Sequence, residues 1–311
     1  MADLRPRPKL YLRLRPDRSR SLPGVSRIFV TGATGNVGRA VVSALRKRGM
    51  DVRVGVRGEG RLRDRHAADL EQVAFDFRDP ASFADACKGC DGLFLLRPPA
   101  IADVDETLHP LVDVALACGV EHVVFISVIG ADRNPLVPHH RVEKHLAATG
   151  ARYTILRPGF FAQNLSDAYR RDIVEDERIY VPAGRGRAAF IDVRDLAEVA
   201  ALVFADPSAH RERGYALTGP VAVGFAEVAA ALRSELGRPI RYVPASIPGY
   251  LWHLHRRGLS WTQAAVQTTL HVGLRFGQAQ TVDPTLQRLL GRPGKTIAEF
   301  IADHRDMWVR Q

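Results

Sequence analysis

The stretch from residue 27 to residue 57 constrains the fold of this chain more than any other. An apolar run at 28–30 leads into a glycine-rich turn, TGATGNVG at 31–38, and apolar residues then recur at helical spacing as far as Gly49. A second apolar segment follows at 51–56. A strand, a glycine turn, a helix and a second strand in this order predict a βαβ unit that binds a dinucleotide at the turn.

The three glycines of the turn have separate physical roles in such a unit. Gly32 permits the tight turn, Gly35 lets the backbone approach a pyrophosphate, and Gly38 lets the helix pack closely on the strand. The N-terminus of the helix then presents unpaired N–H groups and a partial positive charge to the phosphates. The cofactor-binding residues that this turn predicts are Gly32, Thr34, Gly35, Asn36, Val37, Gly38 and Arg39.

The segments that follow alternate between strand-like and helix-like patterns. Strands are predicted at 72–75, 92–96, 123–126 and 153–156, and helices at 62–70, 80–87, 104–118 and 141–149. This alternation predicts an α/β fold, a doubly wound parallel sheet of the Rossmann type. Past residue 160 the alternation loosens, with strand-like pieces at 189–193, 215–217 and 240–243 and helices at 194–205, 225–236 and 297–308. Asp79 and Asp192 precede two of these helices as expected caps.

These patterns divide the 311 residues into three parts. We expect a basic, Pro/Arg-rich extension at 1–26, a nucleotide-binding Rossmann domain at 27–206, and a smaller, mostly helical substrate-binding lobe at 207–311. Residues 161–189 are expected to contribute to the lobe. An aromatic-rich segment at 248–278 lies within the lobe and supplies Trp252 as a candidate substrate contact.

The charge of the chain is unevenly distributed. The formal net charge is +10, and residues 1–26 hold seven basic and two acidic residues, so this extension carries half of the excess. A poorly structured extension is the favoured interpretation, and an organellar transit peptide is the alternative. The remaining positive charge suits an anionic ligand such as a phosphorylated cofactor, and nucleic acid is not an expected partner.

The apolar runs and the cysteines of the chain bear on its compartment and on whether it binds a metal. Hydrophobic residues make up 46% of the chain, but no apolar run approaches the roughly 20 residues that span a bilayer, so no membrane partner is expected. The three cysteines, Cys87, Cys90 and Cys118, do not form a disulfide framework and indicate a reducing cytoplasm. The C-x-x-C pair lies at the end of a predicted helix without further ligands, so no metal site is predicted.

In a doubly wound sheet, ligands bind at the carboxyl ends of the strands. The residues at these ends come from different parts of the sequence but are expected to line one crevice. The further cofactor-binding residues predicted in this way are Arg57, Asp76, Phe77, Leu96, Arg97, Ser127, Pro158, Gly159 and Phe160.

Four segments of the chain resemble the NmrA-like atypical short-chain dehydrogenase/reductases. They are TGATGNVGR at 31–39, YTILRPGFFAQNL at 153–165, IDVRDLAEVA at 191–200 and TIAEFIADHRDMW at 296–308, so the resemblance covers about residues 27–308. The family includes NADPH-dependent quinone reductases and NADP-sensing regulators. Asp76 resembles the acid with which the family contacts adenine, with Phe77 beside the ring, although a plain helix cap is an alternative role for Asp76.

Cofactor choice follows from the charge after the second strand. An NAD site has an acidic residue there for the ribose hydroxyls, whereas an NADP site has an arginine for the 2′-phosphate. Arg57 occupies this position and predicts NADP(H), with Arg39 as a second candidate. A solvated surface arginine is the competing interpretation of Arg57.

The usual catalytic pair of short-chain dehydrogenases is absent. No tyrosine of the chain is followed by a lysine four residues later, so the Tyr-x-x-x-Lys mechanism of carbonyl reduction is unsupported. The same neighbourhood contains His139, His140 and Lys144, and the last two lie on one helical face. A histidine there is the candidate proton donor for hydride transfer. The alternative is that these are ordinary solvent-exposed residues at a helix start.

Quinones, enones, imines and azo compounds need little acid catalysis, because they are already electrophilic and water can supply the proton. Phe160 and Phe161 are expected to wall the nicotinamide pocket or to pack in the core, and Asn164 to bond a substrate oxygen or to cap a helix. We therefore expect an NADPH-dependent reductase of an apolar conjugated small molecule, as a monomer or homodimer. A non-catalytic NADP-sensing regulator and a non-redox biosynthetic tailoring enzyme are the alternatives.

Overall fold

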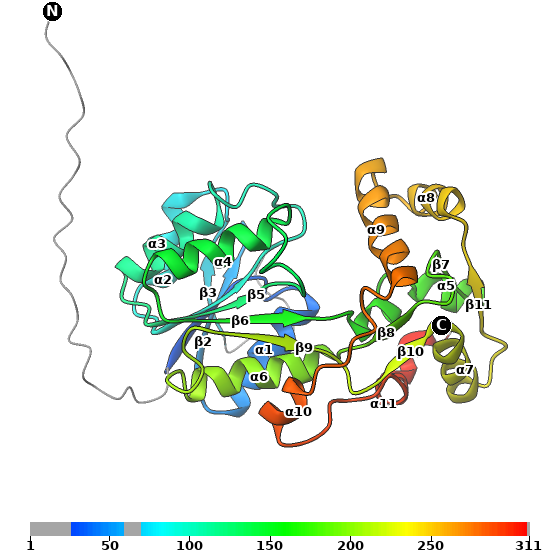
Figure 1. Ribbon diagram of the computed structural model, residues 1–311. Coiled ribbons are helices and arrows are strands. Elements are labelled where there is room, and N and C mark those ends of the chain that lie inside the picture. The colour runs from blue at the N-terminus through cyan, green and yellow to red at the C-terminus, as the bar shows by residue number, and fades with distance from the viewer. Residues whose placement is uncertain (1–25, 59–69, 310–311) are drawn as a thin grey trace, which may run out of the picture.

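A computed structural model describes residues 26–58 and 70–309 of the chain (Figure 1). The expected helix at 62–70 and the basic extension lie almost entirely outside these described residues. None of the helices in the described part of the chain is long and apolar enough to span a lipid bilayer.

A seven-stranded parallel sheet forms the centre of the larger part of the molecule. Its strand order is β3-β2-β1-β4-β5-β6-β9, and every neighbouring pair is parallel. The order reverses at β1, which places a crevice at the carboxyl ends of β1 and β4. The doubly wound α/β fold predicted from the sequence is therefore confirmed. The strands are β1 Arg27–Val30, β2 Asp51–Val56, β3 Glu71–Ala74, β4 Gly92–Leu96, β5 His122–Ile126, β6 Tyr153–Pro158 and β9 Arg213–Leu217.

Helices cover both faces of this sheet. Helices α1 (Asn36–Lys47) and α6 (Val193–Ala205) pack against each other and share one apolar core with the sheet. Helices α2 (Phe83–Cys87), α3 (Leu108–Ala117) and α4 (Pro138–Ala148) enclose a second core on the other face (Figure 1). Strands β4 and β5 are buried on both faces, which explains why their sequences are continuous apolar runs.

The sheet continues past the boundary expected at residue 206. Strand β9 pairs with β6, with Thr154 opposite Arg213 and Pro158 opposite Leu217. Helix α10 (Thr285–Leu290) returns from the C-terminal part and packs on α6 and β9. Residues on the C-terminal side of the expected boundary therefore complete the sheet and its cover, because a strand's partner is chosen by packing and not by its place in the sequence.

A smaller, mostly helical lobe lies beyond the carboxyl ends of β6 and β9, at the right of Figure 1. It has an apolar core of its own, to which Phe190, Phe225 and Trp308 contribute. Two short two-stranded sheets, β7 with β11 and β8 with β10, brace it. Its elements are η3 Ala162–Leu165, α5 Arg170–Glu175, β7 Arg178–Val181, β8 Arg187–Ala189, β10 Ala222–Gly224, α7 Phe225–Leu236, β11 Arg241–Pro244, α8 Ile247–Arg256, α9 Trp261–Gly273, η4 Leu274–Phe276, α11 Ile297–Asp303 and η5 Arg305–Trp308.

Several element boundaries differ from the sequence prediction. Helix α3 begins at Leu108 and not at 104, because residues 105–107 form a separate turn and the N-cap residue Thr107 has a non-helical φ of −122°. Helix α4 begins at Pro138 and not at 141, since proline lacks an N–H and is well suited to the first helical position. The expected strand at 189–193 ends at Ala189, and Asp192 caps α6 instead.

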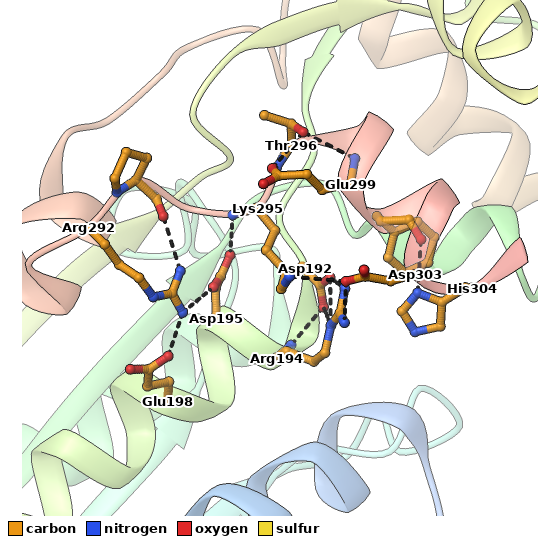
Figure 2. Close-up of polar contacts among 12 residues, drawn as sticks. Asp192, Arg194, Asp195, Glu198, Arg292, Lys295, Thr296, Glu299, Asp303 and His304 are labelled. Atoms are coloured by element: carbon orange, nitrogen blue, oxygen red, sulfur yellow. Dashed lines mark hydrogen bonds and ion pairs between the residues drawn. The ribbon is translucent and has the colours of Figure 1, made fainter. Parts of the chain in front are cut away.

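The IDVRDLAEVA segment anchors the C-terminal region to the first turn of α6 (Figure 2). Asp192 accepts hydrogen bonds from Arg194, whose guanidinium also donates to Asp303 at 2.7 Å. The fully buried Asp195 accepts from Arg292 at 2.9 Å and from the backbone N–H of Lys295 at 2.6 Å. These contacts span about a hundred residues of sequence and hold residues 292–303 against the start of α6.

Candidate functional site

A cavity of about 920 Å³ runs along the carboxyl ends of β1, β2, β3 and β4 and reaches α9 of the lobe. It is lined mostly by residues that the sequence analysis selected. The predicted residues that line it are Gly32, Thr34, Gly35, Asn36, Val37, Arg57, Asp76, Phe77, Leu96, Arg97, Phe161 and Asn164.

The glycine turn forms one wall of the cavity. Gly32 has a φ of +68°, which favours glycine. A Cβ on Gly38 would lie 2.2 Å from the Gly32 carbonyl oxygen, so only glycine lets α1 approach the turn this closely. A Cβ on Gly35 would lie 3.6 Å from the Gly32 carbonyl oxygen, an ordinary contact distance, and Gly35 lines the cavity.

The N-terminus of α1 is free to bind an anion. The capping residue Gly35 contributes no side-chain hydrogen bond, and the first turn of α1 contains no acidic residue. The first N–H groups of a helix have no partner within the helix, so those of α1 point toward the cavity with a partial positive charge. The turn and the helix end together fit the pyrophosphate of a dinucleotide.

The opposite end of the cavity, at β2 and β3, combines a cation with an aromatic wall. Arg57 is exposed immediately after β2 and lines the cavity. Asp76 also lines it and accepts a hydrogen bond from the Arg78 backbone N–H at 2.9 Å. The helical cap is Asp79 instead, which accepts from Ala81, so the capping alternative for Asp76 is wrong. Phe77 packs edge-on against Phe75 with ring centroids 4.9 Å apart.

The residues predicted at the ends of β5 and β6 do not line the cavity. Ser127 is buried and donates its hydroxyl to Glu143 at 2.5 Å, and Glu143 also pairs with Arg157 at 2.6 Å. Pro158 is buried in β6, and the Gly159 N–H donates to the Leu217 carbonyl oxygen at 2.8 Å. Ser127 is turned toward α4 by its hydrogen bond to Glu143, and the backbone of Gly159 is bound to the end of β9.

The adjacent residues Phe160 and Phe161 lie in different environments. Phe160 packs edge-on against Phe190 and Phe225, with centroids 5.4 Å and 6.4 Å away, so it belongs to the lobe core. Phe161 lines the cavity. The core-packing alternative therefore describes Phe160, and the pocket-wall alternative describes the position of Phe161.

The candidate proton donors lie at or beyond the edge of the cavity. His139 Nε2 accepts a hydrogen bond from Arg97 Nε at 3.3 Å, so the ring proton is on Nδ1. Burial, and then the neighbouring Arg97, lowers the pKa of His139 to about 4. The imidazole is neutral at pH 7, which argues against the expected role of His139 as an acidic proton donor. His140 Nδ1 donates to the Ala131 carbonyl at 2.7 Å, and Lys144 is exposed; neither lines the cavity.

Three further predictions lie outside the cavity. Gly38 is buried beneath the turn and acts through packing. Arg39 is exposed on α1 and does not line the cavity. Trp252, on α8, is 56% exposed and lies beside Trp261, with ring centroids 6.0 Å apart.

The structure adds cavity residues that the sequence analysis did not select. Gln163 is buried and joins two of the quoted segments, because its amide donates to Asp192 at 3.1 Å and accepts from the Val193 N–H at 3.1 Å. Gln163 could have been selected from the sequence, because it lies in the YTILRPGFFAQNL segment. Asp167 accepts from the Asn36 amide at 2.5 Å, and burial raises the pKa of Asp167. Gln263 reaches the cavity from α9, and no local pattern marks it.

Comparisons with known proteins agree with this geometry. The model of the NmrA-like family matches residues 25–254. The NAD(P)H azoreductase of Xenophilus azovorans is 32% identical over 281 residues, which cover 89% of this chain and 97% of the azoreductase. The structure of the NADPH-dependent quinone oxidoreductase of Escherichia coli, complexed with NADPH, is 28% identical with a TM-score of 0.78, over 89% of this chain and 99% of the other. The triphenylmethane reductase of Citrobacter sp., 24% identical with a TM-score of 0.78 over 89% and 99%, has the same fold.

Proposed function

The chain belongs to the NmrA-like family, and we propose that it is an NADPH-dependent reductase of apolar conjugated small molecules such as quinones, enones, imines or azo compounds. The observation that carries this proposal is one cavity whose lining includes an anion-binding helix N-terminus and also apolar side chains, among them Ile101 and Phe161. A dinucleotide and a flat acceptor can lie end to end in such a space.

The cofactor half of the cavity suits NADPH. The N–H groups at the start of α1 would hold the pyrophosphate, and Arg57 would bind the 2′-phosphate, since a guanidinium forms paired hydrogen bonds with phosphate oxygens. Asp76 and Phe77 would contact the adenine end. The E. coli relative whose structure contains NADPH supports this assignment.

The acceptor half supplies alignment rather than acid catalysis. When bound, NADPH supplies a hydride, which together with one proton reduces the acceptor by two electrons. Ile101 and Phe161 would form apolar walls that exclude water and orient a planar acceptor. His139 is neutral and bonded to Arg97, so the proton would come from solvent.

The test is turnover with a panel of acceptors. The protein is mixed with NADPH and, in turn, a quinone, an enone, an imine and an azo dye, and the loss of NADPH absorbance is followed. We expect turnover of at least one acceptor class, and a slower rate in a Phe161→Ala variant whose NADPH affinity is unchanged. Tight NADPH binding without turnover of any class would reject the reductase and favour the NADP-sensing alternative.

Two wider expectations remain proposals. We propose a cytoplasmic location, supported by the three free cysteines, of which Cys87 and Cys90 are buried. We also propose a monomer or homodimer that does not bind nucleic acid; gel filtration with light scattering, and a filter-binding assay with duplex DNA, test these statements.

A further inference from the structure

Arg97 differs from the other half-buried arginines of the described residues in having no carboxylate partner. Arg53 pairs with Glu71 at 2.7 Å, and Arg157 pairs with Glu143 at 2.6 Å. Among the described residues, no acidic side chain lies within ion-pair distance of Arg97. Its environment lowers the pKa of Arg97 through burial alone, whereas the hydrogen bond to Glu143 raises the pKa of Arg157.

The guanidinium of Arg97 is held in one orientation by neutral groups. Nη1 donates to the carbonyl oxygens of Pro98 at 3.2 Å and Pro99 at 3.4 Å, and also to that of Ile101. Nε donates to His139 Nε2 at 3.3 Å. Nη2 forms no hydrogen bond to any described residue, although Arg97 lines the cavity. A fixed, partly desolvated cation with two unused donors is therefore presented at the cavity wall.

The position of Arg97 separates it from the phosphates of the cofactor. Arg97 follows β4 and is held by His139 of α4, on the β4–β5 side of the switch point. The pyrophosphate position at α1 and the 2′-phosphate position at Arg57 lie at β1 and β2. A dinucleotide bound across the switch point extends its nicotinamide half toward the β4–β5 side. The anion that Arg97 lacks would then belong to the acceptor.

We propose that Arg97 binds an oxyanion, a carboxylate or sulfonate, carried by the aromatic acceptor, and that His139 is the positioning residue that orients its guanidinium. The substrate class is thereby narrowed from apolar conjugated molecules to conjugated molecules with an acidic substituent. The inference rests on the proposed function only in placing the acceptor in the nicotinamide half of the cavity. A neutral ligand would leave a desolvated charge uncompensated, so the site discriminates by charge.

Calorimetric binding to the full-length protein saturated with NADP⁺ tests the proposal without turnover. Two dyes are compared, a phenylazonaphthol with a para-carboxylate and the methyl ester of the same dye. We expect the wild type to bind the carboxylate dye about 10- to 100-fold more tightly, the range of a charge-assisted hydrogen bond. Arg97→Gln should remove this preference while the affinity for the ester changes less than about twofold, and Arg97→Lys should keep part of it.

Matched variants exclude simpler explanations. Arg133→Gln removes a positive charge from a side chain that is 88% exposed and does not line the cavity, so it should behave as the wild type. His139→Ala should weaken the carboxylate preference less than Arg97→Gln does, and His139→Gln, which keeps an acceptor for Nε, should restore it. Because Nη1 also holds the 98–101 loop, thermal midpoints are measured for every variant, and Arg97→Lys carries the test if Arg97→Gln is unfolded.

The binding measurements distinguish an acceptor anion at Arg97 from a cofactor phosphate at Arg97. If Arg97→Gln weakens both dyes equally, or if the wild type shows no preference or binds neither dye, the proposal is rejected. A large loss of NADPH affinity in Arg97→Gln would assign Arg97 to a cofactor phosphate and also reject it. A wild-type preference that Arg97→Gln abolishes, without turnover of either dye with NADPH, would keep the anion site and overturn the proposed reductase function.

Discussion

The closest packing in the nucleotide-binding turn is at Gly38, and replacing it with alanine should separate the turn from α1. The added Cβ would lie 2.2 Å from the Gly32 carbonyl oxygen and 2.7 Å from Ala33 Cα, whereas Cβ atoms in proteins essentially never approach within 3.0 Å. Both neighbours are backbone atoms and cannot rotate away. Helix α1 would have to move by about 1 Å, an overpacking that typically costs about 1–3 kcal/mol.

The same movement would enlarge the phosphate cradle. We expect Gly38→Ala to lower the free energy of unfolding by this amount and the affinity for NADPH by about tenfold or more, the equivalent of losing one hydrogen bond to the pyrophosphate. Urea unfolding and fluorescence titration with NADPH measure the two effects on the same preparation.

Gly35→Ala is the matched comparison, because it adds the same methyl group three residues earlier. Gly35 has a φ of −88° and its added Cβ would be 3.6 Å from the nearest atom, so alanine fits without strain. Its stability should change by less than about 1 kcal/mol, but the methyl group projects where the pyrophosphate approaches, so NADPH affinity should fall. Unchanged stability in Gly38→Ala, or unchanged NADPH affinity in Gly35→Ala, would refute this account of the turn.

Three further predictions follow from single side chains. Arg57→Asp should weaken NADPH much more than NADH in fluorescence titrations, since only NADPH has the 2′-phosphate; equal losses would remove Arg57 from the phosphate site. Burial lowers the pKa of His122 to about 4, below the ordinary 6.5, so the unfolded chain takes up a proton first on acidification. His122 alone should therefore lower the free energy of unfolding by about 2 kcal/mol between pH 7 and pH 5. His139, whose pKa is also lowered to about 4, adds a separate loss, so His122→Val should remove only the His122 part of the fall in the urea-unfolding profile. Asp195→Ala should lower the free energy of unfolding by about 2–3 kcal/mol, because it leaves the Lys295 N–H without its acceptor and removes one of the two carboxylates that Arg292 binds, the other being Glu198. Glu212→Ala on the surface should change it by under about 0.5 kcal/mol. If the two variants lost a similar free energy of unfolding, the contacts of Asp195 would make no net contribution to stability.

Local patterns in the sequence determined the parts of the structure that depend on neighbouring residues. The glycine turn, the strand periodicity and the caps Asp79 and Asp192 were all predicted because each reports hydrogen bonds or backbone angles within a few residues. Helix α7 was predicted with the same limits, 225–236, that the structure has. The same patterns placed the cofactor crevice, since parallel strands align their carboxyl ends on one edge.

The tertiary structure alone decided which side chains face the crevice and which charges are paired. Ser127 and Arg97 each follow a strand of the same sheet, yet Ser127 is buried against Glu143 while Arg97 faces the cavity without a carboxylate partner. Gln263 reaches the cavity from a helix of the lobe, far along the chain. Such pairing depends on contacts between different helices and strands, as between Arg97 after β4 and His139 of α4. These contacts leave no periodic trace in the sequence, because they are set by how the helices and strands pack together.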